Sequence, residues 1–433
     1  MARKHSTCGH SGPPKVIGYS LSQKKYLVFA EQFYYPEGWG GAQIPLEITM
    51  DLARHGWTVD VVCGSDQYAP ITGASPDPRA AGVRIRRISR LLGGEIHRYK
   101  LLKQLWYYAL SVPLLASCRP AIFIAQTNPP LILPVIAMIS WMRRRPLMII
   151  AQDLYPEVIF AHGMVRANGL RAKLLRGVFR WSYRRAQKII SLGPYMTKRL
   201  IHKGIAPQRI TEISNWATGD EVVVKGSENR LRDAWGLRGK FVVLYSGNIG
   251  IAHDMATPIA AVAAALVLVP NIALVIVGQG PRLAEARALV ADLCIEHAVQ
   301  FRPFVPLELL PHSLGLADVA LVTLRKGFEG LVVPSKLLGH LARGVPTLYI
   351  GPDSDISYFL DESGGGCCFH NGATTLLANE LARLAATPEK LEALGTAGRR
   401  YYERKLAKHI GLSFYRHTVR ELFEAGMAPN TGG

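Results

Sequence analysis

The 433-residue sequence lacks the patterns that define several common classes of protein. It has no Cys-x-x-Cys pair and no cysteine–histidine spacing typical of zinc, so we expect free thiols in a reducing compartment. No glycine-rich segment completes a Gly-x-Gly-x-x-Gly pattern, which leaves a dinucleotide site unsupported. Helix-turn-helix, zinc-finger and aromatic-basic strand patterns are missing too, and we expect no nucleic-acid partner.

Long uninterrupted hydrophobic runs are also missing. Residues 259–278 are almost wholly apolar, but Pro270 and Asn271 divide them into an alanine-rich helix and a β-branched strand. Residues 131–142 are too few to span a bilayer. Residues 1–22 are basic and polar without an apolar centre, unlike a signal peptide. We therefore expect no transmembrane helix, and we expect residues 1–24 to form a disordered basic tail.

Acidic residues are scarce in the first half of the chain. Residues 1–215 contain 30 Lys and Arg against 11 Asp and Glu, whereas the remainder has 21 of each. The whole net charge of +19 thus lies in the first half, which favours an anionic membrane surface as partner. Basic residues are mixed with apolar and aromatic ones in 99–110 and 141–145, as at a membrane interface. The alternative is a solvated helical surface.

Strand and helix patterns alternate along both halves and predict two doubly wound parallel sheets. The expected strands of the first half are Tyr26–Ala30, Thr58–Cys63, Val83–Ile88, Ala121–Ala125, Leu147–Ala151 and Lys188–Leu192. Those of the second half are Phe241–Tyr245, Ile272–Val277, Val299–Arg302, Val319–Leu324, Thr347–Ile350 and Cys367–Phe369. A polar stretch from Asn215 to about Lys240 separates the halves, and a last helix is expected from about Ala397 to Ala425.

The segment Phe328–Lys336 (FEGLVVPSK) carries the most informative motif, directly after a predicted strand. Glu329 lies past the carboxyl end of that strand, where open α/β sheets bind ligands. Pro334 at a first helical position would let the amides of residues 330–333 face an anion, and Lys336 adds a positive charge. A carboxylate suits sugar hydroxyls, while amides and a lysine suit a diphosphate. The segment therefore predicts a nucleotide-sugar site.

Two other loops after strands carry candidate residues. Gly40 and Gly41 precede a helix, so their backbone could approach a phosphate closely; alternatively they form a tight turn. Asp153 could bind an acceptor hydroxyl or act as a weak base; alternatively it caps the next segment.

Together these motifs resemble the GT-B retaining glycosyltransferases of family four. The segment at Glu329 is similar to the form found in the polysaccharide branch of the family (colanic acid, O-antigen and capsule). Tyr245–Gly250, Ala252–Asp254 and Gln152–Glu157 extend the resemblance over about residues 25–410. It implies an α/β fold of two Rossmann-like domains facing a cleft, with a C-terminal helix crossing back to the first.

The resemblance also implies a division of the chain. Residues 25–215 would form an acceptor- and membrane-facing domain, and residues 216–400 a nucleotide-sugar donor domain. Residues 401–433 would form the returning helix and a tail.

Site residues follow from the same resemblance. The catalytic residues would be Glu329, at the hydroxyls of the donor sugar, with Asp153 and Lys336. The donor-binding residues would be Gly40, Gly41, Gly247, Asn248, His253, Arg325, Gly330, Leu331, Val332, Val333 and Lys336. The acceptor-side residues would be Glu37, Asp153 and Glu157.

The diphosphate-binding positions depart from the family pattern. Asn248 and His253 stand where the family often has an arginine and a lysine. This departure makes Lys336 the main expected cation, helped by Arg325 or Lys326.

Two further positions also depart from it. Gln152 replaces a histidine that many members have, so the role of that histidine does not carry over. Gly339 replaces the second motif glutamate, which usually holds the ribose, and this puts ribose recognition in question.

The implied activity is hexosyl transfer from a nucleotide-diphosphate sugar to a lipid-linked glycan, in the cytoplasm at the inner face of the membrane. The expected acceptor is a polyprenyl-diphosphate-linked glycan of a bacterial surface polysaccharide. Asp353-Ser354-Asp355 lies beyond a different strand, so we expect neither a metal nor a cofactor. No carboxylate is placed for a covalent intermediate, which favours front-face displacement. The alternatives are a nucleotide-sugar epimerase of the same fold and a non-catalytic membrane-surface scaffold.

Overall fold

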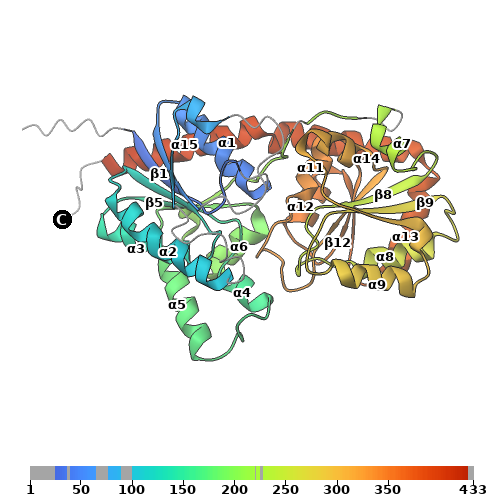
Figure 1. Ribbon diagram of the computed structural model, residues 1–433, viewed down its shortest axis with the longest axis horizontal. Helices are drawn as coiled ribbons and strands as arrows, with labels where there is room; N and C mark the ends of the chain where they lie inside the picture. Colours follow the sequence, from blue (N-terminus) through green and yellow to red (C-terminus); the bar gives the residue numbers. More distant parts are fainter. Residues whose placement is uncertain are drawn as a thin grey trace, which may run out of the picture.

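The protein forms two α/β domains that lie side by side along its long axis (Figure 1). The computed structural model describes residues 25–36, 40–64, 77–88, 100–219, 221–224 and 228–427. The predicted tail at 1–24, the candidate residue Glu37 and Tyr99 of the basic aromatic stretch lie outside the described residues. Both sheets are parallel throughout, as the alternation of strand and helix patterns predicted.

The first domain has a seven-stranded sheet in the order β3-β2-β1-β4-β5-β6-β7. Its strands are β1 (Tyr26–Ala30), β2 (Thr58–Cys63), β3 (Arg84–Arg87), β4 (Ile122–Gln126), β5 (Leu147–Ile150), β6 (Lys188–Ser191) and β7 (Ile210–Glu212). Its helices are α1 (Gly40–Arg54), α2 (Lys100–Ser117), α3 (Ile132–Met142), α4 (Glu157–Ala161), α5 (Leu170–Arg185) and α6 (Pro194–His202). The sequence did not predict β7, because its three residues are not fully buried and leave no apolar run.

The second domain has a six-stranded sheet in the order β10-β9-β8-β11-β12-β13. Its strands are β8 (Phe241–Ser246), β9 (Ile272–Val277), β10 (Val299–Arg302), β11 (Val319–Thr323), β12 (Thr347–Ile350) and β13 (Gly366–Phe369). Its helices are α7 (Arg230–Ala234), α8 (Ala256–Ala265), α9 (Leu283–Asp292), α10 (Leu310–Gly315), α11 (Lys336–Ala342), α12 (Asp355–Ser363), α13 (Thr374–Ala385) and α14 (Pro388–Tyr401). The long apolar segment is therefore α8 followed by β9, and no described helix is long and apolar enough to cross a membrane.

The prediction of one continuous last helix is wrong. After α14, a π-helical turn over Tyr402–Leu406 leads to Ala407 in an extended conformation, and α15 (Lys408–Met427) starts anew. Buried Tyr402 holds this turn, since its hydroxyl accepts the Ala217 amide and donates to Glu221. No proline lies at the break, so the sequence pattern predicted that the helix continues across it.

Helix α15 returns to the first domain, as expected for the GT-B fold. Three of its residues lie in the hydrophobic core between the first sheet and helix α1, namely Tyr415, Val419 and Phe423. Arg416 forms an ion pair with Asp51 of α1 over 2.8 Å.

Helix α2 corrects part of the predicted membrane-facing surface. Tyr107 and Tyr108 are buried in the core of the first domain with residues of α3, because the face of α2 that carries them packs inward. At the end of α3, by contrast, Trp141 and Met142 are exposed.

Candidate active site

Lys336 lies at the start of α11, against the loops that follow β8 and β11. Its Nζ donates a hydrogen bond to Nε2 of His253 over 3.1 Å and lies 5.2 Å from the centre of the Tyr245 ring. Burial lowers the pKa of Lys336 to about 7, and among the described residues no carboxylate pairs with it. A half-buried cation without a counter-charge is suited to receive an anionic ligand.

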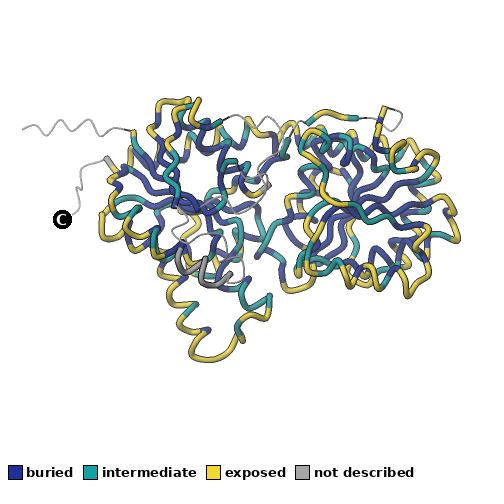
Figure 2. Tube along the Cα trace, viewed as in Figure 1, coloured by how far each residue is buried: buried dark blue, intermediate teal, exposed yellow. Residues whose placement is uncertain are grey.

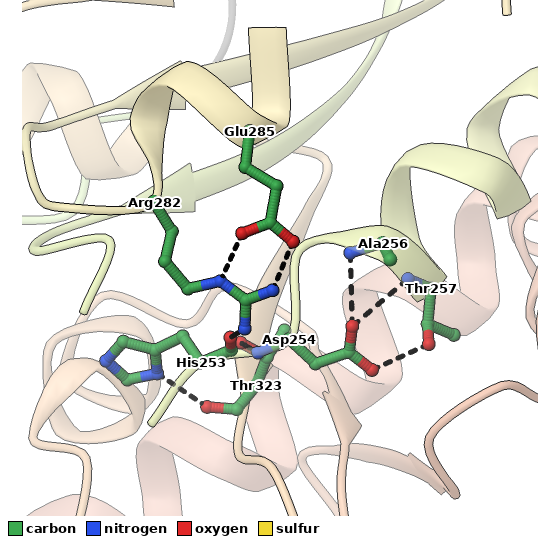
Figure 3. A network of polar contacts seen from close by, with 7 residues as sticks. All are labelled: His253, Asp254, Ala256, Thr257, Arg282, Glu285 and Thr323. Carbon is green, nitrogen blue, oxygen red and sulfur yellow. Dashed lines mark hydrogen bonds and ion pairs between the residues drawn. The ribbon is translucent and has the colours of Figure 1, made fainter. Parts of the chain in front are cut away.

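His253 holds this lysine in place. Its Nδ1–H donates to the carbonyl of Thr323 over 2.8 Å (Figure 3). Nε2 therefore keeps the lone pair that accepts from Lys336. Burial, followed by the nearby charge of Lys336, lowers the pKa of His253 to about 3. His253 is therefore neutral at pH 7 and orients the ammonium without adding charge.

Gly247 leaves the space that Lys336 occupies. Its φ is +129°, and a Cβ at this position would lie 2.6 Å from Cε of Lys336. Any side chain would displace the lysine, which explains the glycine. The neighbouring candidate Asn248 is exposed, and its backbone carbonyl accepts the Tyr245 hydroxyl over 2.9 Å.

Arg282 is a second cation near this site that sequence reasoning missed. Its Nη1 donates to the carbonyl of His253 over 3.0 Å, and its Nε pairs with Glu285 over 2.8 Å (Figure 3). Arg282 follows β9 at the end of a glycine-rich loop, the same pattern that drew attention to Gly40 and Gly247. The predicted helper Arg325 has an exposed side chain.

Glu329 is held between the two domains. Its Oε2 accepts the amide of Gly327 over 2.7 Å, and its Oε1 pairs with Nη2 of Arg199 over 3.4 Å. Nε of Arg199 also donates to the Glu329 carbonyl over 3.1 Å. Arg199 belongs to α6 of the first domain, and nothing in that ordinary amphipathic helix predicted the contact.

The apolar part of the motif also crosses to the first domain. Leu331 is buried in the core of the first domain, and its carbonyl accepts the amide of Leu154 over 2.9 Å. Val332 forms an isolated antiparallel bridge with Asp153. Val333 packs against the same core. The segment that carries Glu329 and the loop that carries Asp153 are thus in direct backbone contact.

The backbone of the motif differs from the sequence prediction. Helix α11 begins at Lys336, so Pro334 is not its first residue. The amides of Leu331 and Val332 donate to the carbonyl of Phe328 over 3.0 and 3.4 Å. These two amides are already bonded in this structure, because the turn after Phe328 folds back on itself.

Gly330 lies close against the start of α6 in the first domain. Its φ is +66°, and a Cβ here would lie 2.8 Å from the backbone oxygen of Tyr195. A second contact lies nearby, where Oδ1 of Asp355 accepts the amides of Tyr195 and Met196 over 2.9 and 3.4 Å. Asp355, noted in the sequence as part of an Asp-x-Asp pattern, thus binds the start of α6.

Asp153, predicted to act on the acceptor, lies just past β5. Burial raises the pKa of its carboxyl to about 6, although a hydrogen bond from Tyr155 lowers it in part. Its amide donates to Oγ1 of Thr127 over 3.1 Å. A carboxyl with this pKa can exchange a proton near neutral pH.

The acceptor-side candidate Glu157 has a structural partner, since it forms an ion pair with Lys203. Gln152, for which no role was predicted, exchanges amide hydrogen bonds of 3.3 and 2.9 Å with Asn215.

The remaining glycines occupy two different settings. Gly40 begins α1, and Gly41 is exposed with nothing within 4 Å of an added Cβ. Gly339 is confined, since an added Cβ would lie 3.2 Å from Leu314, and its carbonyl accepts from the buried Arg343 over 3.1 Å. A glutamate at position 339 would therefore require its surroundings to shift.

Two protein-family models match the chain, one on each domain. A glycosyl transferase 4-like domain matches residues 40–216, and a glycosyl transferases group 1 domain matches residues 227–401. This chain belongs to the family-four glycosyltransferases of the GT-B fold. The resemblance drawn from the motifs is confirmed.

Curated relatives agree with this assignment. The chain is 27% identical over 323 residues to the probable glycosyltransferase WbjE of Pseudomonas aeruginosa, covering 73% of this chain and 78% of that protein. It is 27% identical over 198 residues to the putative colanic acid biosynthesis glycosyl transferase WcaI of Escherichia coli, covering 45% and 48%.

Solved structures share the fold. HepE of Anabaena, in complex with UDP and glucose, has a TM-score of 0.67 at 16% identity, covering 93% of this chain and all of that chain. WaaG, a glycosyltransferase of lipopolysaccharide biosynthesis, has a TM-score of 0.61 at 16% identity, covering 94% of this chain and all of that chain.

Proposed function

We propose that this glycosyltransferase moves a hexosyl group, with retention at the anomeric carbon, from a nucleotide-diphosphate sugar to a polyprenyl-diphosphate-linked glycan. The product would enter a bacterial surface polysaccharide. The observation that carries the proposal is Lys336, a half-buried cation that has no carboxylate partner in the described part of the chain and is oriented by His253. The complex of HepE with UDP and the name of WcaI support the donor class and the polysaccharide.

Lys336 would stabilise the departing diphosphate. As the bond between the anomeric carbon and the diphosphate oxygen breaks, negative charge grows on that oxygen. A preoriented ammonium stabilises this charge better than water does. The bound diphosphate would also raise the pKa of Lys336, so the lysine stays protonated during transfer.

Glu329 and Asp153 would act on the two sugars. Glu329 would bind hydroxyls of the donor sugar after exchanging part of its contact with Arg199. Asp153, which lies opposite Val332 of the donor motif, would bind the attacking hydroxyl of the acceptor and favour loss of its proton. In a front-face displacement the hydroxyl attacks on the side from which the diphosphate leaves, so that anion can take the proton. Lys336 supplies the charge that a metal would otherwise supply.

A lipid-linked acceptor places the reaction at a membrane. We propose that the protein works in the cytoplasm, on the inner face of the cell membrane, and contacts anionic lipids there. The excess of basic residues in the first half of the chain supports this location.

The first test is a thermal-shift screen with UDP, GDP, TDP, CMP and their sugar conjugates. One diphosphate should raise the melting temperature of the wild type but not of Lys336→Ala. Lys240→Ala is the matched control and should respond like the wild type. Lys240 precedes the first residue of β8, whereas Gly247 follows its last residue, so the two lie at opposite ends of that strand.

Transfer with the selected donor tests the chemistry. Glu329→Ala should lose transfer while the fold is kept, and NMR of the product should show the anomeric configuration of the donor. An inverted product would refute retention. Conversion of the donor without acceptor would favour the epimerase, and no response to any nucleotide with intact vesicle binding would favour the scaffold.

A further inference from the structure

Helix α5 carries an exposed apolar stripe that the fold does not use. The helix extends away from both sheets, and its outer side is exposed along most of its length (Figures 1 and 2). The opposite side of α5 already packs against the first domain without help from the stripe, since Ala172, Phe179 and Tyr183 are buried there.

The stripe consists of large side chains at helical spacing. Leu170 is 84% exposed and Leu174 66%, and Val178 and Trp181 are exposed by 37% and 38%. At about 100° per residue, these four positions fall within an arc of about 80° on one side of the helix. Four large apolar groups aligned in water, one of them tryptophan, are typical of a helix that lies in a membrane interface.

Basic residues border this stripe. Lys173, Arg176, Arg180 and Arg184 form a second column beside it, since they are three or four positions apart. The whole segment from residue 158 to residue 211 contains twelve lysines and arginines and no aspartate or glutamate. Such a surface repels cations and complements a layer of anionic headgroups.

We infer that α5 docks on an anionic lipid bilayer with its apolar stripe in the headgroup region. The α5 surface is defined as Leu170, Leu174, Val178 and Trp181 with Lys173, Arg176, Arg180 and Arg184. This inference rests on the proposed function for the acceptor, which would be embedded in the same bilayer. It differs from the interface expected at Tyr107 and Tyr108, which are buried.

The position of α5 fits delivery of a lipid-linked acceptor. Helix α4, which precedes α5 in the chain, begins at Glu157, four residues after Asp153. Just past α4, the ring of His162 contacts Phe328, at the start of the donor-side motif, with 5.4 Å between ring centres. The segment from Asp153 to Leu170 therefore links the acceptor side of the active site to the docking surface, so the headgroup of a bilayer lipid would approach the site from this side.

The test is co-sedimentation with vesicles, without donor or acceptor. The wild type should bind vesicles of equal parts phosphatidylglycerol and phosphatidylcholine and should not bind phosphatidylcholine alone. Substitution L170S/L174S/W181S should weaken binding about tenfold or more, because it removes the buried apolar area. Substitution K173Q/R184Q should weaken it about fivefold per charge and reduce its dependence on salt.

The control is W141S/M142S, which removes an exposed apolar pair at the end of α3. This variant should bind vesicles like the wild type. The thermal shift with the selected diphosphate, whose site lies in the other domain, should be kept in every variant and reports both folding and the proposed function.

Three results would overturn the inference. One is equal vesicle binding by the wild type and L170S/L174S/W181S, and another is loss of binding in W141S/M142S alone. The third is equally tight binding to a DNA duplex, which would make the surface a general polyanion site. Loss of the diphosphate response with vesicle binding intact would contradict the proposed function instead.

Discussion

Raising the pH from 6.5 to 8.5 should weaken the binding of a nucleoside diphosphate through one side chain, Lys336. In the free protein, burial lowers the pKa of this lysine to about 7. A bound diphosphate carries opposite charge and raises that pKa, so the complex keeps the proton that the free protein loses. The affinity should therefore be highest below pH 7 and fall as the pH rises toward the pKa of the complex.

The size of the effect follows from the fraction of protonated lysine. With a pKa of about 7, this fraction falls from about 0.76 at pH 6.5 to about 0.03 at pH 8.5, so the affinity should fall about 25-fold. Ionisation of the ligand has the opposite effect, since a terminal phosphate with a pKa of about 6 gains charge as the pH rises. A decline above pH 7 therefore reports the protein.

Isothermal titration with the selected diphosphate at constant ionic strength measures this effect. Lys336→Met should bind weakly, with no decline above pH 7, because no titrating cation remains. Lys336→Arg should also show no decline, since a guanidinium stays charged throughout. A wild-type affinity that changes less than threefold, or a decline of the same size in Lys336→Met, would refute the role of Lys336.

Three other substitutions test the packing around the site. Lys336→Met should raise the melting temperature most below pH 7, where the lysine is charged in both states and folding carries the full cost of desolvating it. The gain should shrink toward pH 10, because the pKa of Lys336 is lower in the folded than in the unfolded state. Calorimetry at several pH values measures this, and no gain at pH 6 would contradict it. Gly330→Ala should slow transfer more than tenfold by pushing the domains apart, whereas Gly327→Ala, also at positive φ but with open space, should not; equal rates would contradict this. Trp216→Ala should lower the free energy of unfolding, measured in urea, by about 3–5 kcal/mol, because Trp216 is buried between α1 and α15. Trp181 is exposed, so the control Trp181→Ala should lower it by less than about 0.5 kcal/mol.

Much of the fold could be predicted from the sequence because the central parallel strands are buried on both faces. Such strands appear as short apolar runs, and β1, β2, β9 and β12 have the predicted bounds, as does the partly buried β10. The predictions failed where burial was incomplete or packing changed the backbone. Strand β7 has too little apolar surface to be seen, and the turn at Tyr402 depends on a hydroxyl contact with a distant part of the chain.

The candidate site was predictable to the extent that it depends on loop position. Glu329, His253 and Asp153 all follow predicted strands, and the structure places them at the carboxyl ends of β11, β8 and β5. Arg199 and Arg282 were missed, because ordinary arginines in a helix and a loop become part of a site only through their spatial neighbours.

The sequence by itself determined the two α/β halves, the family motifs and the uneven distribution of charge. These properties reside in local apolar periodicity and in residue identity, which need no knowledge of distant contacts. Only the tertiary structure decided that Lys336 lies half-buried beside a neutral His253 and that Leu331 packs into the core of the other domain. It also decided that the apolar stripe of α5 has no partner among the described residues. Each of these properties depends on which groups shield a side chain from water, and packing between segments far apart in the sequence determines that shielding.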